Sequence, residues 1–208
     1  MARTPLRTPK VFCVGFQKTG TSSLGRAGTQ LGYRVTGPDG TSDARIGENA
    51  LDLAMRLAPR FDFFQDNPWP VLYREMDEAF PGSKFILTTR DSASWIGSMK
   101  KHFAGTDRPM LRWLYGAPDP AGNEQSFIRT YESHNQAVLS YFEGRESFLH
   151  LDIFADPTWK RLADFLEVEA PTELLPHANS ASSRNPRWGQ SSLVRHAREL
   201  KRRIRRNL

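Results

Sequence analysis

The stretch that decides the fold is residues 11–25, VFCVGFQKTGTSSLG. Residues 11–16 form an apolar run that is typical of a strand buried on both faces of a sheet. A short polar turn with a single lysine, Lys18, follows, and a helical pattern starts at Thr21. A strand, a glycine-containing turn and a helix start together present free backbone N–H groups and the positive end of a helix dipole. We therefore predict a phosphate-binding loop here.

The rest of the chain alternates short apolar runs with amphipathic segments. Further strands are expected at 33–36, 61–64, 84–89 and 148–153, and helices at 21–31, 46–57, 71–80, 93–103, 123–142 and 156–166. This alternation predicts parallel strands joined by right-handed crossovers, and hence a three-layer α/β/α fold with a central, mostly parallel sheet. In such sheets ligands bind beyond the carboxyl ends of the strands.

Length and composition indicate a single domain over residues 1–208, with a loose N-terminal arm at 1–10 and a basic amphipathic helix at 191–208. The lone cysteine, Cys13, excludes a disulfide framework and a cysteine-rich zinc site, and it favours a reducing compartment. No secretory signal and no apolar run long enough to span a membrane is present, so a cytoplasmic location is expected.

The net charge of +6 belongs to the C-terminus, because residues 195–208 carry seven basic side chains and one acidic side chain, and the remainder is neutral. A docked helix with a solvated basic face is the favoured interpretation. The alternative is a tail that binds an anionic surface, such as nucleic acid or acidic lipid.

The loop differs from an ordinary nucleoside triphosphate-binding loop. Gly15 and Gly20 have the spacing of the GxxxxGK[ST] pattern, but Thr21 stands where that pattern has lysine. This argues against ATP or GTP hydrolysis. Lys18 is shifted to a place where it could stabilise charge on the bridging oxygen of a phosphate-linked leaving group.

A second strand, within FILTTRDSASWIGSM, ends in Arg90, and Ser98 follows on the next expected helix. Arginine supplies a planar set of donors that suits a phosphate. Asp91 or Ser92 is expected to cap this helix. Arg90 and Ser98 could reach one phosphate only if it lies along the helix.

The segment QKTGTSSL resembles the 5′-phosphosulfate loop of sulfotransferases that use 3′-phosphoadenosine 5′-phosphosulfate (PAPS), and an arginine with a serine eight residues later is their second signature. FPGSKFILTTRD, DPTWKRLADFL and LPHANS are similar to a bacterial and fungal branch, so the resemblance covers most of residues 11–185. It implies a P-loop NTPase-like sulfotransferase fold and in-line sulfuryl transfer to a hydroxyl or amine, with adenosine 3′,5′-bisphosphate (PAP) as product and no metal. The cofactor-binding residues that it implies are Gln17, Lys18, Thr19, Gly20, Thr21, Ser22, Ser23, Arg90 and Ser98.

Two features depart from the cytosolic members of this family. Ser23 stands where they have a tryptophan that stacks on adenine, so adenine must be held in another way. Their C-terminal Arg-Lys-Gly stretch is also missing, and Arg184 or Arg187 could replace it at the 3′-phosphate; the alternative is that both are solvated loop arginines.

Transfer to a hydroxyl needs a general base, and relatives place a histidine or carboxylate after the strand that precedes the arginine-bearing one. Asp66 stands there and is the first choice, although it could instead fix the proline-rich turn. Glu75, His102 and, remotely, His134 are the other candidates.

The expected acceptor is a small molecule or glycan, and an aromatic wall would suit an apolar or ring-bearing one. The wall would consist of Trp69, Trp95, Phe103, Trp113 and Tyr115, with residues 104–122 as an irregular lid. Ordinary core packing is the alternative for these aromatics. The competing functions are a P-loop kinase or NTPase, and a non-catalytic protein that binds anionic surfaces through its tail.

Overall fold

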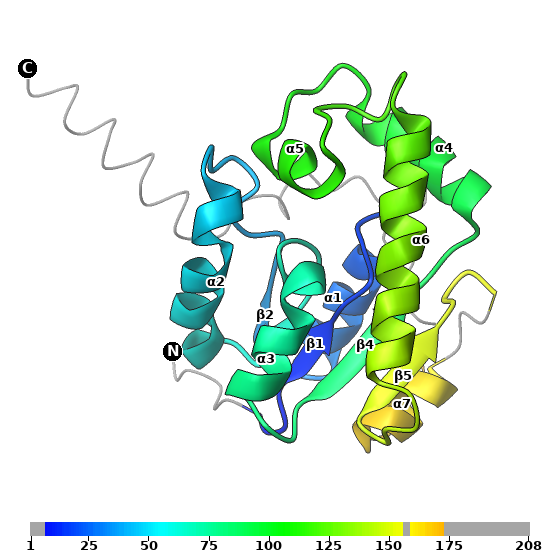
Figure 1. Cartoon of the computed structure of the whole chain (residues 1–208). Helices are drawn as coiled ribbons and strands as arrows, with labels where there is room; N and C mark the ends of the chain where they lie inside the picture. Colours follow the sequence, from blue (N-terminus) through cyan, green and yellow to red (C-terminus); the bar gives the residue numbers. More distant parts are fainter. Residues whose placement is uncertain (1–6, 156–158, 173–208) are drawn as a thin grey trace, which may run out of the picture. The chain divides into compact units, whose positions relative to one another are not determined.

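The computed structural model describes residues 7–155 and 159–172. They contain a five-stranded sheet with the order β2-β3-β1-β4-β5, in which every strand pair is parallel (Figure 1). The strands are β1 Val11–Cys13, β2 Val35–Thr36, β3 Phe63–Phe64, β4 Lys84–Thr88 and β5 Phe148–Leu151. The predicted α/β class with a parallel sheet is therefore confirmed.

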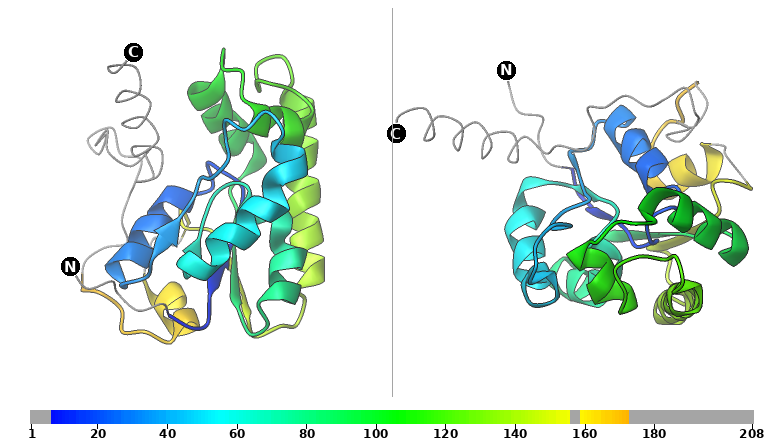
Figure 2. Two further views of the ribbon diagram at one scale, coloured as in Figure 1. Left: turned by 90° about the vertical axis from the view of Figure 1, so that its left-hand side faces the viewer. Right: turned by 90° about the horizontal axis from the view of Figure 1, so that it is seen from above.

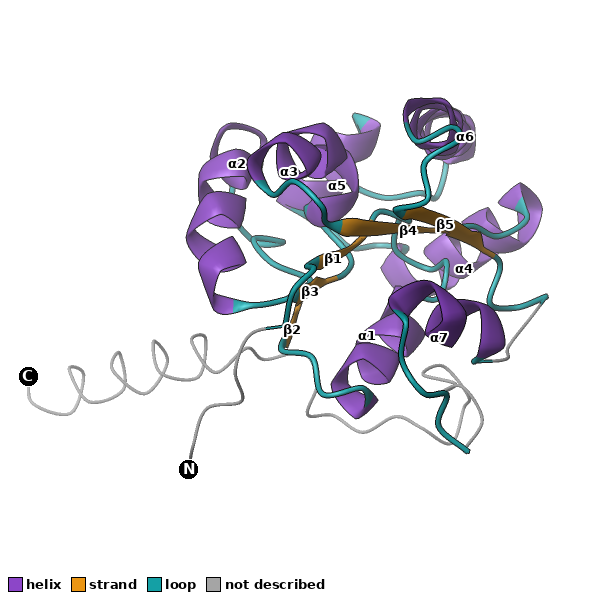
Figure 3. Ribbon diagram, turned by 90° about the horizontal axis from the view of Figure 1, so that it is seen from below, coloured by secondary structure: helices purple, strands orange, loops and turns teal. Residues whose placement is uncertain are grey.

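Helices cover both faces of the sheet (Figure 3). In chain order the α-helices are α1 Thr21–Gln30, α2 Ile46–Leu57, α3 Tyr73–Ala79, α4 Ser92–Phe103, α5 Pro109–Tyr115, α6 Glu124–Tyr141 and α7 Lys160–Leu166, with 3-10 turns η1 Ala58–Arg60 and η2 Trp69–Leu72. Helices α2, α3 and α6 pack on one face, and α1 and α7 pack on the other. This is the predicted three-layer arrangement.

The two cores follow from the alternation of side chains along the strands. In β1, Phe12 packs with α2, α3 and α6, whereas Val11 and Cys13 pack with α1 and α7. In β4 the same alternation places Phe85 and Ile86 in opposite cores. Both faces of the sheet are thus apolar, as a parallel sheet covered on both sides requires.

Two expected segments were wrong in part. Residues 104–122 are not wholly irregular, because Met110, Leu111 and Tyr115 bury one side of α5. The expected helix at 71–80 is divided into η2 and α3. The 3-10 turn η2 contains Pro70, which has no N–H group to donate to a helical hydrogen bond.

The order of the strands fixes the position of a ligand crevice. From the central strand β1 the chain passes to β2 and β3 on one side and then crosses to β4 and β5 on the other. A reversal of this kind opens a crevice at the carboxyl end of the central strand. Helices α4 and α5 lie toward this end of the sheet (Figures 1 and 2), and both contribute to a third apolar cluster that includes Phe16.

Contacts divide the chain into two units, residues 1–176 and 177–208. The second unit lies entirely outside the described residues. The predicted basic helix at 191–208, the arginines Arg184 and Arg187, and the expected start of a helix at Asp156 all fall outside the described ranges.

Candidate functional site

The loop between β1 and α1 leaves backbone N–H groups at the N-terminus of α1 available to a ligand. Gly20 precedes the helix with φ 102°, and a Cβ atom at this position would lie 1.9 Å from Cδ1 of Ile153, so only glycine fits. None of the hydrogen bonds of the described residues uses the backbone N–H groups of Gly20, Thr21 or Ser22, and no acidic side chain lies in the first turn. Free N–H groups at the positive end of a helix dipole are the groups that bind anions in other proteins, so they make this end of α1 a candidate anion-binding site.

Thr19 anchors this loop to β4. Its hydroxyl donates to the carbonyl of Phe16 at 2.6 Å and shares a hydrogen bond of 2.7 Å with the hydroxyl of Thr88. The side chain is fully buried. Gly15 permits the close approach, because a Cβ atom there would lie 2.4 Å from the carbonyl oxygen of Thr88.

Gln17 anchors the same loop to the segment after β3 and to α4. Its side-chain oxygen accepts from Nδ2 of Asn67 at 2.9 Å, and its carbonyl accepts from the indole of Trp95 at 2.9 Å. The side chain is 3% exposed. The structure therefore turns two predicted cofactor-binding side chains, Gln17 and Thr19, into the protein, where they hold the loop in shape.

Lys18 lies in the loop after β1, at the carboxyl end of the central strand, with φ 70° and its side chain partly exposed. It forms no ion pair or hydrogen bond with any described residue. Burial lowers the pKa of its ammonium group, the nearby Asp66 carboxylate raises that pKa, and the Arg90 guanidinium lowers it further. The charges of Asp66 and Arg90 therefore both act on Lys18.

Asp66 follows β3 in a left-handed conformation with φ 62°. Its carboxylate accepts from the backbone N–H of Asn67 at 2.7 Å and from the hydroxyl of Thr21 at 3.2 Å. Burial raises the pKa of this carboxyl group, while the two hydrogen bonds and Lys18 lower it. A carboxylate with a raised pKa beside a ligand crevice is suited to accept a proton.

Asp39, after β2, is a second carboxylate that the sequence analysis missed. It accepts from the hydroxyl of Thr36 at 2.9 Å and from the indole of Trp69 at 3.2 Å, and burial raises its pKa. Its charge also raises the pKa of Asp66. The sequence offered one clue to Asp39: it follows a predicted strand, just as Asp66 follows the next predicted strand.

Arg90 follows β4, and Tyr131 of α6 fixes its backbone. The N–H of Arg90 donates to the Tyr131 hydroxyl at 2.8 Å, and that hydroxyl also lies 2.8 Å from the Arg90 carbonyl. The guanidinium lies 4.6 Å from the ring centroid of Phe154 and has no carboxylate partner among the described residues.

Ser98 lies in the second turn of α4, partly buried, and its hydroxyl has no hydrogen-bond partner in the described part of the chain. Asp91 caps this helix by accepting from the N–H of Ser94 at 2.9 Å, as one of the two predicted caps. The start of α4 is therefore held in place beside Arg90.

The other predicted site residues of the loop face different directions. Thr21 is buried and donates to Asp66, Ser22 is exposed, and Ser23 is only 7% exposed. Ser23 therefore occupies the place of the missing tryptophan without offering a surface to a ligand.

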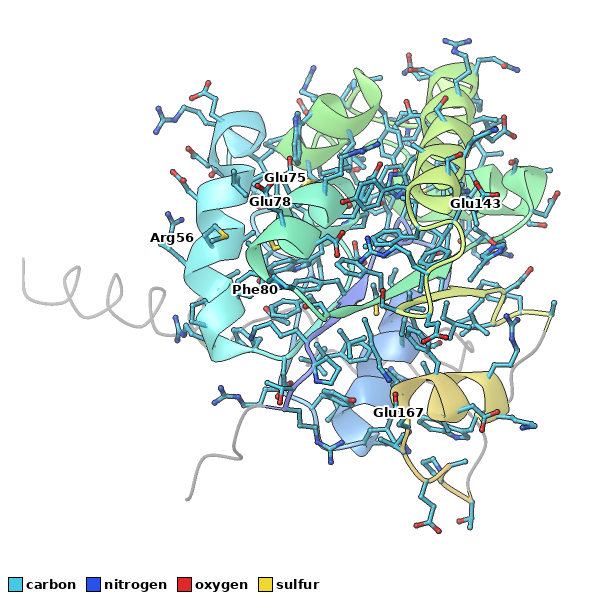
Figure 4. All side chains as sticks on the ribbon, turned by 60° about the horizontal axis from the view of Figure 1, so that its bottom comes forward. Arg56, Glu75, Glu78, Phe80, Glu143 and Glu167 are labelled. Atoms are coloured by element: carbon cyan, nitrogen blue, oxygen red, sulfur yellow. The ribbon has the colours of Figure 1, made fainter. Side chains whose placement is uncertain are left out.

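The alternative proton acceptors differ in their relation to the crevice. His102 lies in the last turn of α4, where burial and the charge of Lys18 lower its pKa, so it lies near the loop. Glu75 lies on the exposed side of α3 (Figure 4), and no interaction joins it to the described crevice residues. His134 lies with Nε2 2.8 Å from the Val14 carbonyl, and its ring stacks on Phe16 at 4.1 Å. Burial lowers its pKa to about 4.

Core packing accounts for three of the five predicted acceptor-wall aromatics. Trp69 and Trp95 are fully buried and Tyr115 is almost so, whereas Phe103 and Trp113 are partly exposed. A separate open pocket of 440 Å³ lies between the loop, η2, α5 and α6. Its lining residues are Phe16, Val71, Leu114, Arg129, Thr130, Ser133 and His134.

All five strand ends contribute to the crevice region. The contributing residues are Lys18, Asp39, Asp66, Arg90 and Phe154. Two cations without ion-pair partners among the described residues, together with an open helix N-terminus, suit a ligand with two anionic groups. The adjacent carboxylates can accept a proton. Among the described residues no cluster of histidine, cysteine or acidic side chains could hold a metal ion, and none of the described helices is long and apolar enough to cross a membrane.

Comparison with known proteins gives one finding. The sequence model of the family described as Sulfotransferase domain matches residues 10–121 and 106–184, which include the whole crevice. No curated protein matches the chain.

Proposed function

The chain belongs to the Sulfotransferase domain family, and we propose that it moves a sulfuryl group from PAPS to a hydroxyl or amine of an acceptor. Family membership indicates sulfotransfer. The identity of the donor and the roles of individual residues are proposals. One observation carries the proposal: Lys18 and Arg90 lie beside the open N-terminus of α1, and neither is paired with a described carboxylate.

PAPS, the sulfuryl donor, carries two anionic groups on one ribose, and the crevice offers a separate cationic place for each. The N–H groups of Gly20, Thr21 and Ser22 suit the 5′-phosphosulfate. Arg90 suits the 3′-phosphate, together with the Ser98 hydroxyl further along α4, which no described residue binds. The residues present therefore fit this donor.

In the transfer step the acceptor oxygen forms a bond to sulfur while the bond from sulfur to the 5′-phosphate oxygen breaks. Lys18 stabilises the charge that develops on the departing phosphate oxygen of PAP. Asp66 accepts the proton that the acceptor hydroxyl loses, and its raised pKa brings its basicity closer to that task. His102 is the second candidate for this proton, because it also lies near Lys18.

For the part of the acceptor remote from its reacting hydroxyl we propose the pocket that shares Phe16 with the loop, because Lys18, Asp66 and His102 do not line this pocket. Val71 and Leu114 give it apolar walls, and Arg129, Thr130 and Ser133 add polar groups. An acceptor with an apolar body and a polar or anionic substituent matches that lining.

Thermal unfolding with added nucleotide tests the donor assignment. PAP should raise the midpoint, because a ligand at 100 times its Kd stabilises the folded state by about 2.7 kcal/mol, whereas ATP with Mg²⁺ should not. Lys18→Met and Arg90→Met should lose the shift, and Lys101→Met, a change at an exposed lysine of α4, should keep it. A shift with ATP–Mg²⁺ alone would instead support a kinase or NTPase.

A further inference from the structure

Phe154 is a large aromatic side chain that the fold leaves in solvent. It is 44% exposed, and the other large exposed hydrophobics of the described residues, Leu51, Met55 and Leu139, are aliphatic. Its turn is well defined, because Oδ1 of Asp152 accepts from the N–H of Phe154 at 2.9 Å and from that of Ala155 at 3.2 Å. The ring is thus held in an exposed position just beyond the carboxyl end of β5.

The ring borders both anion-binding parts of the crevice. On one side its Cε2 atom lies 3.9 Å from the position that a Cβ of Gly20 would occupy, at the start of α1. On another side the guanidinium carbon of Arg90 lies 4.6 Å from the ring centroid. Phe154 therefore stands between the place proposed for the 5′-phosphosulfate and the place proposed for the 3′-phosphate.

We propose that Phe154 is the aromatic surface on which the adenine of the donor stacks, an inference that rests on the proposed function. The base and both phosphates are attached to one ribose, so the base must lie near a residue that borders both phosphate places. Ser23, the position of the usual tryptophan, is small and 7% exposed, so it cannot provide a stacking surface. The exposed part of the Phe154 ring can provide a stacking surface for the base. Arg90 adds a cationic group against the same ring.

The test compares two ligands by calorimetry on the full chain: PAP, and ribose 3,5-bisphosphate, which has the phosphates without the base. Phe154→Ala should weaken PAP binding by about 5- to 150-fold, the range measured for loss of one base–aromatic stack. Its affinity for ribose 3,5-bisphosphate should stay within about twofold of the original value. Phe154→Trp should restore PAP binding, and Leu139→Ala, which removes an exposed hydrophobic from α6, should change neither affinity.

The outcomes separate the inference from the proposed function. Equal losses for both ligands in Phe154→Ala would show that the ring only positions Arg90, and this would overturn the adenine assignment. Unchanged PAP binding in Phe154→Ala would overturn it as well. Failure of the unaltered protein to bind PAP would instead refute the proposed donor.

Discussion

Replacement of Asp66 by asparagine separates the chemical role of this residue from its structural role. Asp66 has φ 62°, a left-handed conformation that asparagine tolerates and alanine does not. In the unaltered protein the Asp66 carboxylate accepts from the N–H of Asn67 at 2.7 Å, and asparagine retains an oxygen that can accept the same hydrogen bond. It cannot accept a proton from an acceptor hydroxyl. Asp66→Asn therefore removes the proposed base and preserves the turn.

The expected magnitudes follow from these contacts. Loss of a general base lowers kcat by about 10²- to 10⁴-fold, so both Asp66→Asn and Asp66→Ala should lose activity to that extent. Alanine in the left-handed region costs about 1–2 kcal/mol. An Asn67 N–H left without its acceptor costs about 1–3 kcal/mol more. Asp66→Ala should therefore be destabilised by about 2–5 kcal/mol, and Asp66→Asn by much less.

The pH dependence gives an independent check with a definite sign. Burial raises the pKa of Asp66 in the folded state, so its effect on stability is favourable at low pH and is lost as the pH rises through the raised pKa. Asp66→Asn should therefore be more stable relative to the unaltered protein at pH 7 than at pH 4. Activity of the unaltered protein should fall as the pH drops through the same pKa, because the base becomes protonated.

Three measurements decide the matter: PAP release from PAPS with an acceptor found by screening, PAP affinity by calorimetry, and urea unfolding at pH 4 and pH 7. We expect lost turnover, retained PAP binding and the stability order given above. Full activity in Asp66→Asn would refute the assignment of the base and direct attention to His102. Equal destabilisation of the two variants would refute the argument from the left-handed backbone.

The remaining predictions concern the loop and the core. Lys18→Met should lower turnover by about 10²- to 10³-fold in the same assay, without loss of stability in urea, because Lys18 forms no ion pair with a described residue. Normal turnover would contradict its role at the leaving group. Gly20→Ala should abolish the thermal shift with PAP and destabilise the fold by about 1–3 kcal/mol or more, since a Cβ would lie 1.9 Å from Ile153. Gly97→Ala is its control: it lies in α4 with open space around it, and should stabilise by about 0.5–1 kcal/mol. His134 has a pKa of about 4, so the free energy of unfolding should fall by up to about 3 kcal/mol as the pH drops from 6.5 to 4. In urea titrations His134→Gln should make the free energy of unfolding depend less on pH over this range. An unchanged slope would contradict the burial of a neutral imidazole.

Local patterns in the sequence were sufficient for the fold class and for the strand, turn and helix that form the first loop. The run at 11–16, the glycine turn and the following helix are neighbours along the chain, so their physical meaning can be read without any long-range contact. The same holds for Arg90 and Ser98, which share a strand end and the helix after it. The family match covers these segments.

The direction of individual side chains required the tertiary structure. Gln17 and Thr19 look as available to a ligand as Lys18 in the sequence, but hydrogen bonds to Phe16, Thr88 and Asn67 hold the first two in the interior. Helix α5 was missed because flanking proline and glycine residues suggested an irregular segment, whereas burial of its apolar side stabilises a helix.

By itself the sequence determined a parallel α/β sheet and a glycine-containing loop, with a displaced lysine, between its first strand and the helix that follows. Only the tertiary structure decided which strand ends meet, and it placed Asp39 beside Asp66 and Phe154 beside Arg90. The physical reason is that periodicity along a chain reports local geometry and burial, whereas neighbours across the sheet depend on the strand order β2-β3-β1-β4-β5. That order arises from contacts between residues far apart in the sequence.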